Sequence, residues 1–173
     1  MTARIDQMTR FSYTTYIHAT PEQVWQALTV PACTKRYWRH HTAGEKTFRS
    51  DWKKGSTWDL LHEEVGLVVS DPEQVILESD PPRRLAFTWH TFTPEWAAKV
   101  GMDDATAEVW RSERRSKVAF GIDGSGHGVV KLTVVHDGFE PGSHVLEGIS
   151  DGWPAVFSGL KTLLETGSAL PWT

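Results

Sequence analysis

Hydrophobic and polar residues alternate with a period of two along most of the chain between Lys46 and Asp137. In the clearest stretch, residues 85–90 read Leu-Ala-Phe-Thr-Trp-His, so that every second side chain is large and apolar. This alternation predicts strands with one buried face, and the short turns between them predict antiparallel pairing. The expected strands are 11–18, 47–52, 57–62, 66–78 with an interruption near Asp71-Pro72, 85–90, 117–122 and 131–136.

A different pattern follows the first strand and predicts two short helices. Thr20 is a candidate N-cap, Pro21 suits the first helical position, and Gln23 completes a capping box. A second helix is expected over 31–38, because a proline again stands at its start.

Apolar residues recur at helical spacing over 145–164 and predict a long C-terminal helix. Pro154 would break the interior of a helix, because it has no N–H and its ring clashes with the preceding turn. We therefore expect a turn over 143–150, a main helix over 151–166, and a stop at Gly167.

Residues 93–115, here called the excursion, separate two strands and carry two short helical patterns, over 94–100 and 104–111. Connections of this length are uncommon, and many of them are lids or binding loops. A surface elaboration is the alternative, and the sequence leaves both open.

The order of these elements predicts an α+β fold. We expect a strongly curved antiparallel sheet of six to seven strands, two short helices after the first strand, and the C-terminal helix on the concave face. One domain should cover 11–167, with a loose N-terminal tail over 1–10 and a C-terminal tail over 168–173.

Composition removes several classes of function. The net charge of −4, from 18 Lys and Arg against 22 Asp and Glu, disfavours nucleic-acid binding. No apolar run is long enough for membrane insertion, and no secretory signal is recognised, so a cytoplasmic location is expected. The single cysteine, Cys33, and the absence of a zinc-ligand spacing predict no metal site, and we expect no cofactor.

Four strings of sequence resemble a known family. Residues 19–25 (ATPEQVW) resemble the strand-to-helix signature of the START-like superfamily, whose fold is called helix-grip. Residues 77–89, 131–139 and 152–167 resemble the branch of that superfamily that contains activators of the heat-shock-protein-ninety ATPase. The resemblance spans about 11–167. It implies a deep, mostly apolar cavity but no single function, because members include co-chaperone domains, lipid and hormone binders, and polyketide cyclases.

Aromatic residues are abundant, with nine Trp, seven Phe and three Tyr. On the predicted register many of them point to the concave face, where they would form either a filled core or the wall of a ligand cavity. The resemblance favours the cavity. The predicted lining residues are Phe48, Trp52, Trp58, Leu60, His62, Phe87, Trp89, Phe120, Leu132, Val134, His136, Trp153, Val156, Phe157 and Leu160.

Two histidines in this set carry candidate chemistry. His62 and His136 share a face with large apolar residues, where each could hydrogen-bond a ligand or act as a general acid or base. A buried histidine satisfied by a backbone carbonyl or a carboxylate is the alternative.

The leading hypothesis is therefore a non-enzymatic protein that binds a small apolar or aromatic ligand. A cyclase- or aromatase-like enzyme that uses a cavity histidine is the second hypothesis. The third is a co-chaperone-like interaction module, with a chaperone or a second copy of the chain as its partner.

Overall fold

The expected order of elements is present in the computed structural model, which describes residues 7–39 and 44–171. The strand β1 (Arg10–His18) is followed by the helices α1 (Pro21–Thr29) and α2 (Pro31–Tyr37). The predicted capping box holds α1, since Thr20 Oγ1 accepts from Gln23 N and Gln23 Oε1 accepts from Thr20 N. Residues 1–6 of the predicted N-terminal tail lie outside the described residues.

The strands form two antiparallel sheets. The larger has the order β1-β8-β7-β6-β5 and the smaller the order β2-β3-β4. Backbone hydrogen bonds and a bridge between Thr57 and Val75 join their ends. The bounds of the strands after β1 are β2 (Thr47–Arg49), β3 (Asp59–His62), β4 (Leu67–Val69), β5 (Ile76–Asp80), β6 (Arg84–Thr88), β7 (Lys117–Gly124) and β8 (Val129–Asp137).

The α+β helix-grip class is confirmed, but the described residues form eight strands instead of six to seven. The predicted strand 66–78 divides at the Asp71-Pro72 turn into β4 and β5, which belong to different sheets. The predicted strand 47–52 ends at Arg49, because Ser50 Oγ accepts from Trp52 N at 3.0 Å and turns the chain. Trp52 accordingly has a positive φ of 56°.

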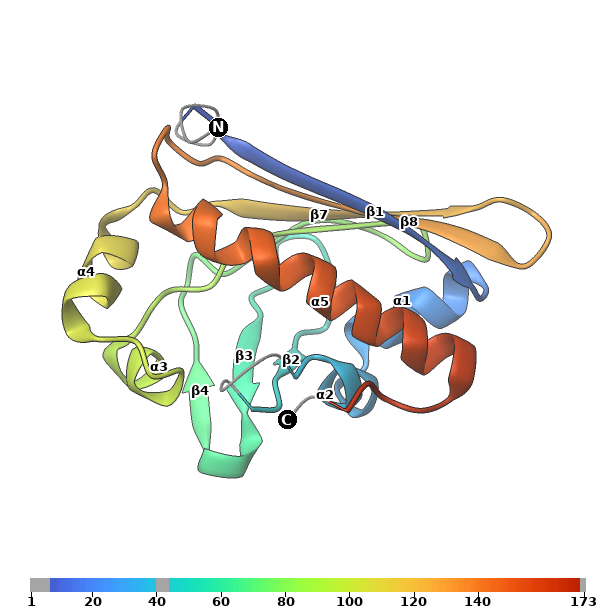
Figure 1. Ribbon diagram of the computed structural model, residues 1–173, viewed down its shortest axis with the longest axis horizontal. Helices are drawn as coiled ribbons and strands as arrows, with labels where there is room; N and C mark the ends of the chain where they lie inside the picture. Colours follow the sequence, from blue (N-terminus) through green and yellow to red (C-terminus); the bar gives the residue numbers. More distant parts are fainter. Residues whose placement is uncertain (1–6, 40–43, 172–173) are drawn as a thin grey trace.

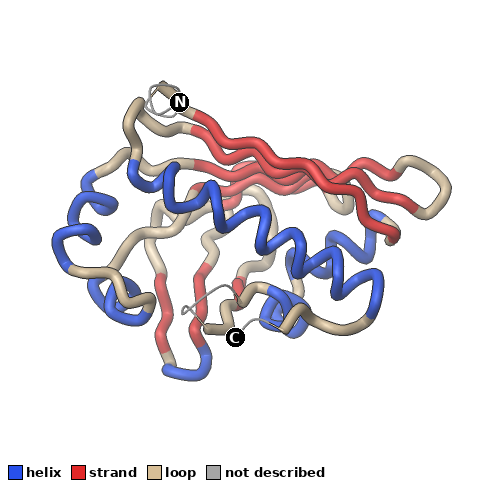
Figure 2. Tube along the Cα trace, viewed as in Figure 1, coloured by secondary structure: helices blue, strands red, loops and turns tan. Residues whose placement is uncertain are grey.

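The long helix α5 (His144–Thr166) crosses the inner face of the larger sheet, with α1 and α2 beside one end of it (Figures 1 and 2). A short 3-10 helix, η3 (Glu63–Val65), joins β3 to β4, and α3 (Pro94–Lys99) and α4 (Asp104–Ser112) lie within the excursion. The excursion packs at the other end of α5 from α1 and α2 (Figure 1). None of the helices among the described residues is long and apolar enough to cross a membrane.

The predicted start of the C-terminal helix was wrong. Residues 143–150 form no separate turn, because α5 begins at His144 and continues through Pro154. Its first turn is held by the Ser143 cap and by the Glu113 carboxylate, which accepts from His144 N at 2.8 Å. Burial of residues such as Ile149 adds tertiary support, so that the helix tolerates a proline in its interior. Gly167 ends α5 in the left-handed conformation, as predicted.

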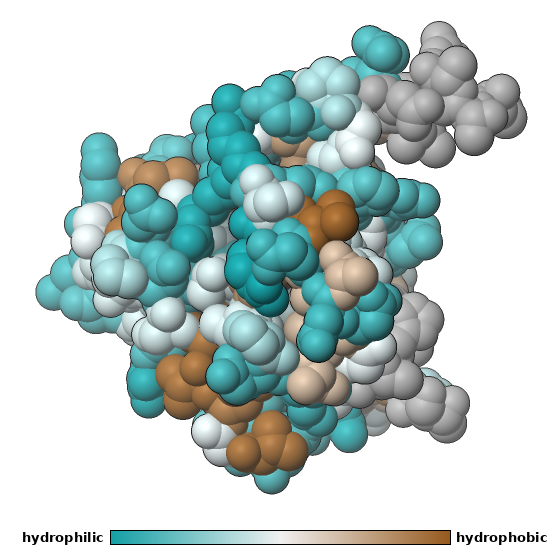
Figure 3. All heavy atoms as spheres, turned by 90° about the vertical axis from the view of Figure 1, so that its left-hand side faces the viewer, coloured by the Kyte–Doolittle hydropathy of each residue, from teal (hydrophilic) through white to brown (hydrophobic). Residues whose placement is uncertain are grey.

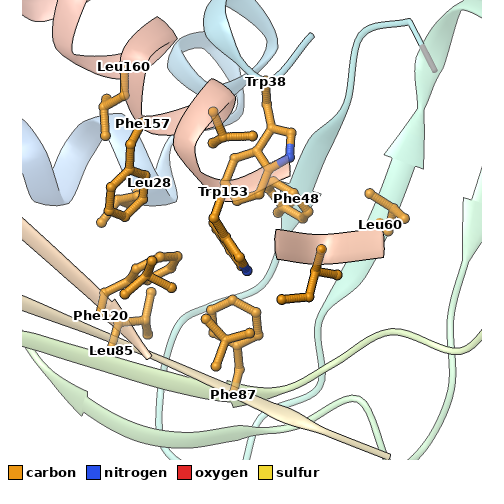
Figure 4. Packing of buried hydrophobic residues seen from close by; sticks show 14 of the residues in the cluster. Leu28, Trp38, Phe48, Leu60, Leu85, Phe87, Phe120, Trp153, Phe157 and Leu160 are labelled. Carbon is orange, nitrogen blue, oxygen red and sulfur yellow. The ribbon is translucent and has the colours of Figure 1, made fainter. Parts of the chain in front are cut away.

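The centre of the core lies where α5 meets the larger sheet. Phe157 and Leu160 of α5 and Leu132 and Val134 of β8 are fully buried there. Trp153 projects from the same helix between Trp38 and the sheet residues (Figure 4).

Candidate functional site

A cavity of about 260 Å³ lies between α5, the end of β6 and the excursion. Its wall contains six aromatic residues: Trp38, Trp89, Phe92, Trp96, Trp110 and Trp153. Val100, Met102, Ile149 and Val156 add aliphatic surface, and Gly148 and Gly152 of α5 leave their part of the wall without side chains. Within residues 7–39 and 44–171, Lys46 and His90 are the lining residues with titratable side chains.

The aromatic rings contact one another along the wall in edge-to-face and tilted arrangements and do not fill the cavity. The ring centroids of Phe92 and Trp110 are 5.3 Å apart with an interplanar angle of 81°. The centroids of Phe92 and Trp96 are also 5.3 Å apart, and those of Trp89 and Trp153 are 5.7 Å apart. Contacts of this kind stabilise aromatic pairs, so the rings support one another around the cavity.

The excursion is held in place by bonds at both of its helices. Thr93 and Asp103 cap α3 and α4. Arg111 Nε donates to the carbonyl of Phe92 at 2.8 Å. The excursion therefore forms a wall of the cavity, to which it contributes Trp96, Val100, Met102 and Trp110.

Close approach of α4 to α5 depends on Gly148. A Cβ atom added at this position would lie 2.4 Å from Cη2 of Trp110. Gly152, one turn later, faces open space, since a Cβ atom there would meet nothing within 4 Å. Seen from the excursion side, apolar residues at the surface form small patches among polar ones (Figure 3).

Lys46 is a half-buried cation in this apolar wall. Burial lowers the pKa of its ammonium group from the usual 10.5 to about 8. Among the residues described, no carboxylate lies within ion-pair distance of Lys46, whereas the nearby Lys99 pairs with Glu64 at 3.0 Å.

His90 is buried against the same wall, with its ring centroid 5.0 Å from that of Trp96. Its Nδ1 lies 2.7 Å from the carbonyl oxygen of Thr91, so Nδ1 carries the proton and Nε2 is an acceptor. Burial is the main cause that lowers the pKa of His90 to about 3, and the charge of Lys46 adds to the shift. The imidazole is therefore neutral at pH 7.

His136 lies in the core behind the cavity, with a partner for each ring nitrogen. Nε1 of Trp153 donates to Nδ1 of His136 at 3.1 Å, which leaves the proton on Nε2. Nε2 then donates to Ser116 Oγ at 2.8 Å. Burial lowers the pKa of His136 to about 3, and this neutral histidine fixes the indole of Trp153 in the cavity wall.

His62 is fully buried on β3 but does not line the cavity. Neither of its ring nitrogens has a side-chain or backbone partner among residues 7–39 and 44–171. Burial first, and then the charges of Lys46 and Lys99, lower its pKa to about 4.

The predicted lining residues divide into three groups. Trp89, Trp153 and Val156 line the cavity. Phe48, Trp52, Trp58, Phe87 and Phe120 instead surround a void of only about 10 Å³. The other seven are buried and border neither space: Leu60, His62, Leu132, Val134, His136, Phe157 and Leu160.

The other eleven described residues that line the cavity were not in the predicted set. Strict alternation placed His90 on the opposite face from Trp89, but β6 ends at Thr88 and both residues reach the cavity. Trp96 and Trp110 lie in the excursion, whose length had marked it as a candidate binding loop without showing which of its residues face inward.

The sequence of this chain is similar to that of a known protein family. Residues 18–165 match the sequence profile of the family described as Activator of Hsp90 ATPase homolog 1-like protein. The chain therefore belongs to this family. A comparison with curated protein sequences gave no match.

Several solved structures share the fold. A protein of Mesorhizobium loti is 23% identical with a TM-score of 0.64, covering 90% of this chain and 96% of its own. The Aha1 dimer of Colwellia psychrerythraea is 17% identical with a TM-score of 0.62, covering 92% and 98%. An HSP90 activator of Plasmodium falciparum is 17% identical with a TM-score of 0.62, covering 91% and 96%. The family and the fold support a ligand-binding or co-chaperone-like module.

Proposed function

We propose that this protein binds a small hydrophobic or aromatic molecule in the cavity between α5 and the excursion. The observation that carries this proposal is an open volume of about 260 Å³ with six aromatic residues in its wall. An apolar cavity of about 150 Å³ is enough for benzene, and sites for drug-sized ligands begin near 300 Å³. The expected guest therefore has one or two rings.

Gly152 offers a direct way to test the cavity. It lies on the same face of α5 as Ile149 and Val156, which also line the cavity, and a Cβ atom there meets open space. The substitution Gly152→Leu should therefore fill part of the volume without a clash. Ser158→Leu, on the exposed side of the same helix, is the matched control.

The experiment is a titration with indole and 2-naphthamide, followed by isothermal titration calorimetry and native mass spectrometry. Wild type and Ser158→Leu should form 1:1 complexes, with dissociation constants on the order of 100 μM for guests of this size. Gly152→Leu should retain its fold and bind at least tenfold more weakly. Absence of any complex at millimolar guest, or equal binding by Gly152→Leu, would contradict the proposal.

A second candidate function is a co-chaperone-like interaction, which membership of the family favours. Relatives of the same fold include an HSP90 activator. The test is the rate of ATP hydrolysis by a purified Hsp90-type chaperone with and without this chain. A rate that saturates with added chain would support the interaction, and an unchanged rate would count against it. The cytoplasmic location expected from the sequence stays a prediction.

The enzyme hypothesis depended on His62 and His136 as catalytic residues, and neither of them lines the cavity. Both ring nitrogens of His136 are engaged within the core, and His62 lies outside the cavity wall. No observation in the described residues assigns either histidine a reacting group, so we do not propose a catalytic mechanism.

A further inference from the structure

The charge in the cavity wall narrows the class of ligand, provided that the cavity binds a ligand as proposed above. Among the described residues that line the cavity, Lys46 alone has a charged side chain at pH 7. Within the described residues it lacks a carboxylate partner, unlike Lys99, which pairs with Glu64, and Lys161, which pairs with Glu165 at 2.7 Å. A cation surrounded by apolar groups is costly unless an anion pairs with it.

Apart from Lys46, the described residues that line the cavity offer the guest no charge of either sign. His90 is neutral, and its protonated Nδ1 is already used by the carbonyl of Thr91. Tryptophan, phenylalanine and aliphatic side chains form nearly all of the remaining wall. The site therefore combines one positive charge with flat aromatic surfaces.

We propose that the ligand of this cavity is a small aromatic carboxylic acid, whose carboxylate pairs with the Lys46 ammonium while its ring packs among the tryptophans. A single negative charge balances the single cation. A cationic guest would be repelled, and a neutral guest would cover the ammonium group without replacing its water.

The test compares 2-naphthoic acid with 2-naphthamide, which has nearly the same shape and no charge. Isothermal titration calorimetry on the full chain at pH 7 should give at least tenfold tighter binding of the acid. Lys46→Met should remove this preference and keep the affinity for the amide. Lys131→Met, which removes an exposed lysine of β8 outside the cavity, should leave the preference unchanged.

The pH dependence gives a second readout. As the pH rises from 7 to 9.5, Lys46 loses its proton and the affinity for 2-naphthoate should fall, while the affinity for the amide stays constant. The other titratable groups around Lys46 are the neutral His62 and His90 and the Lys99–Glu64 ion pair. In Lys46→Met the fall should disappear.

The outcomes separate this inference from the proposed function. If wild type binds the amide as tightly as the acid, the role of Lys46 is refuted and the cavity is still a binding site. If Lys46→Met still binds the acid more tightly than the amide, another group binds the carboxylate, and the inference is also refuted. If neither compound binds, both the inference and the proposed function fail.

Discussion

Two regions of the same interior are lined by aromatic residues, but only one of them is hollow. The packed half, around Phe48, Trp58, Phe87 and Phe120, leaves about 10 Å³, whereas the hollow half, around Trp89, Trp96, Trp110 and Trp153, leaves about 260 Å³. Both halves are rich in large rings. Aromatic content therefore does not decide whether this interior is a core or a container.

The difference lies in which elements face each other. In the packed half, Phe120 of β7 packs against Trp153 and Phe157 of α5. Contacts between neighbouring rings continue from Phe120 through Phe87 and Trp58 to Phe48. In the hollow half the opposing wall is the excursion, and α5 presents Gly148 and Gly152 to it. The missing side chain of Gly152 leaves open space, whereas Gly148 allows the Trp110 ring of the opposing wall to approach α5 closely.

The largest expected effect is on the free energy of unfolding, and it is tested by removing one ring from each half. Phe120 is 2% exposed and packs within 5.6 Å of Trp153 and 5.8 Å of Phe87, measured between ring centroids. Phe120→Ala should lower the free energy of unfolding by about 3–5 kcal/mol, because it opens a cavity in a closely packed region. Trp110→Ala, at a half-buried ring beside existing open volume, should cost roughly half as much. Urea denaturation measures both, and equal costs would remove the distinction between the halves.

Acid should lower the free energy of unfolding, because His90 is buried in the hollow half in its neutral form. Its pKa is about 3 in the folded protein and near 6.5 when unfolded, so the unfolded chain binds the proton more readily. The stability that depends on neutral His90 is complete above pH 6.5 and is lost as the pH falls toward 3. Between pH 7.5 and pH 5 the loss should be about 2 kcal/mol.

The substitution His90→Leu isolates this contribution from that of other groups. Its loss of unfolding free energy over the same pH interval should be about 2 kcal/mol smaller than that of wild type. An identical loss in the two proteins would mean that water or a rearranged side chain already satisfies a charged His90.

The fold was largely predictable because its signals are local. The period of two in the strands, the capping box of Thr20 and Gln23, and the stop at Gly167 all act within a few residues. The start of α5 was not predictable in this way. It depends on Glu113, which is 31 residues away from His144 in the sequence and accepts its N–H.

The site was less predictable because its wall forms where regular structure ends. Alternation identifies which side chains share a face only while a strand continues, and it failed for His90 beyond the end of β6. Trp96 and Trp110 lie in short helical patterns, and such patterns do not indicate which side of the helix faces the sheet. Alternation also cannot distinguish a ring that packs against another ring from a ring that faces open volume.

The smallest expected effect tests the two glycines that α5 places in the cavity wall. Gly152→Ala should raise the free energy of unfolding by up to about 1 kcal/mol, because alanine favours the helix and its methyl group meets nothing within 4 Å. Gly148→Ala brings the same gain in helix propensity, but its methyl group collides with Trp110. Overpacking typically costs about 1–3 kcal/mol, so this variant should be no more stable than wild type. Differential scanning calorimetry of the two variants measures the difference. Equal stabilisation by both would show that Trp110 moves away from α5 without cost, and the excursion would then be a loosely held wall instead of a packed one.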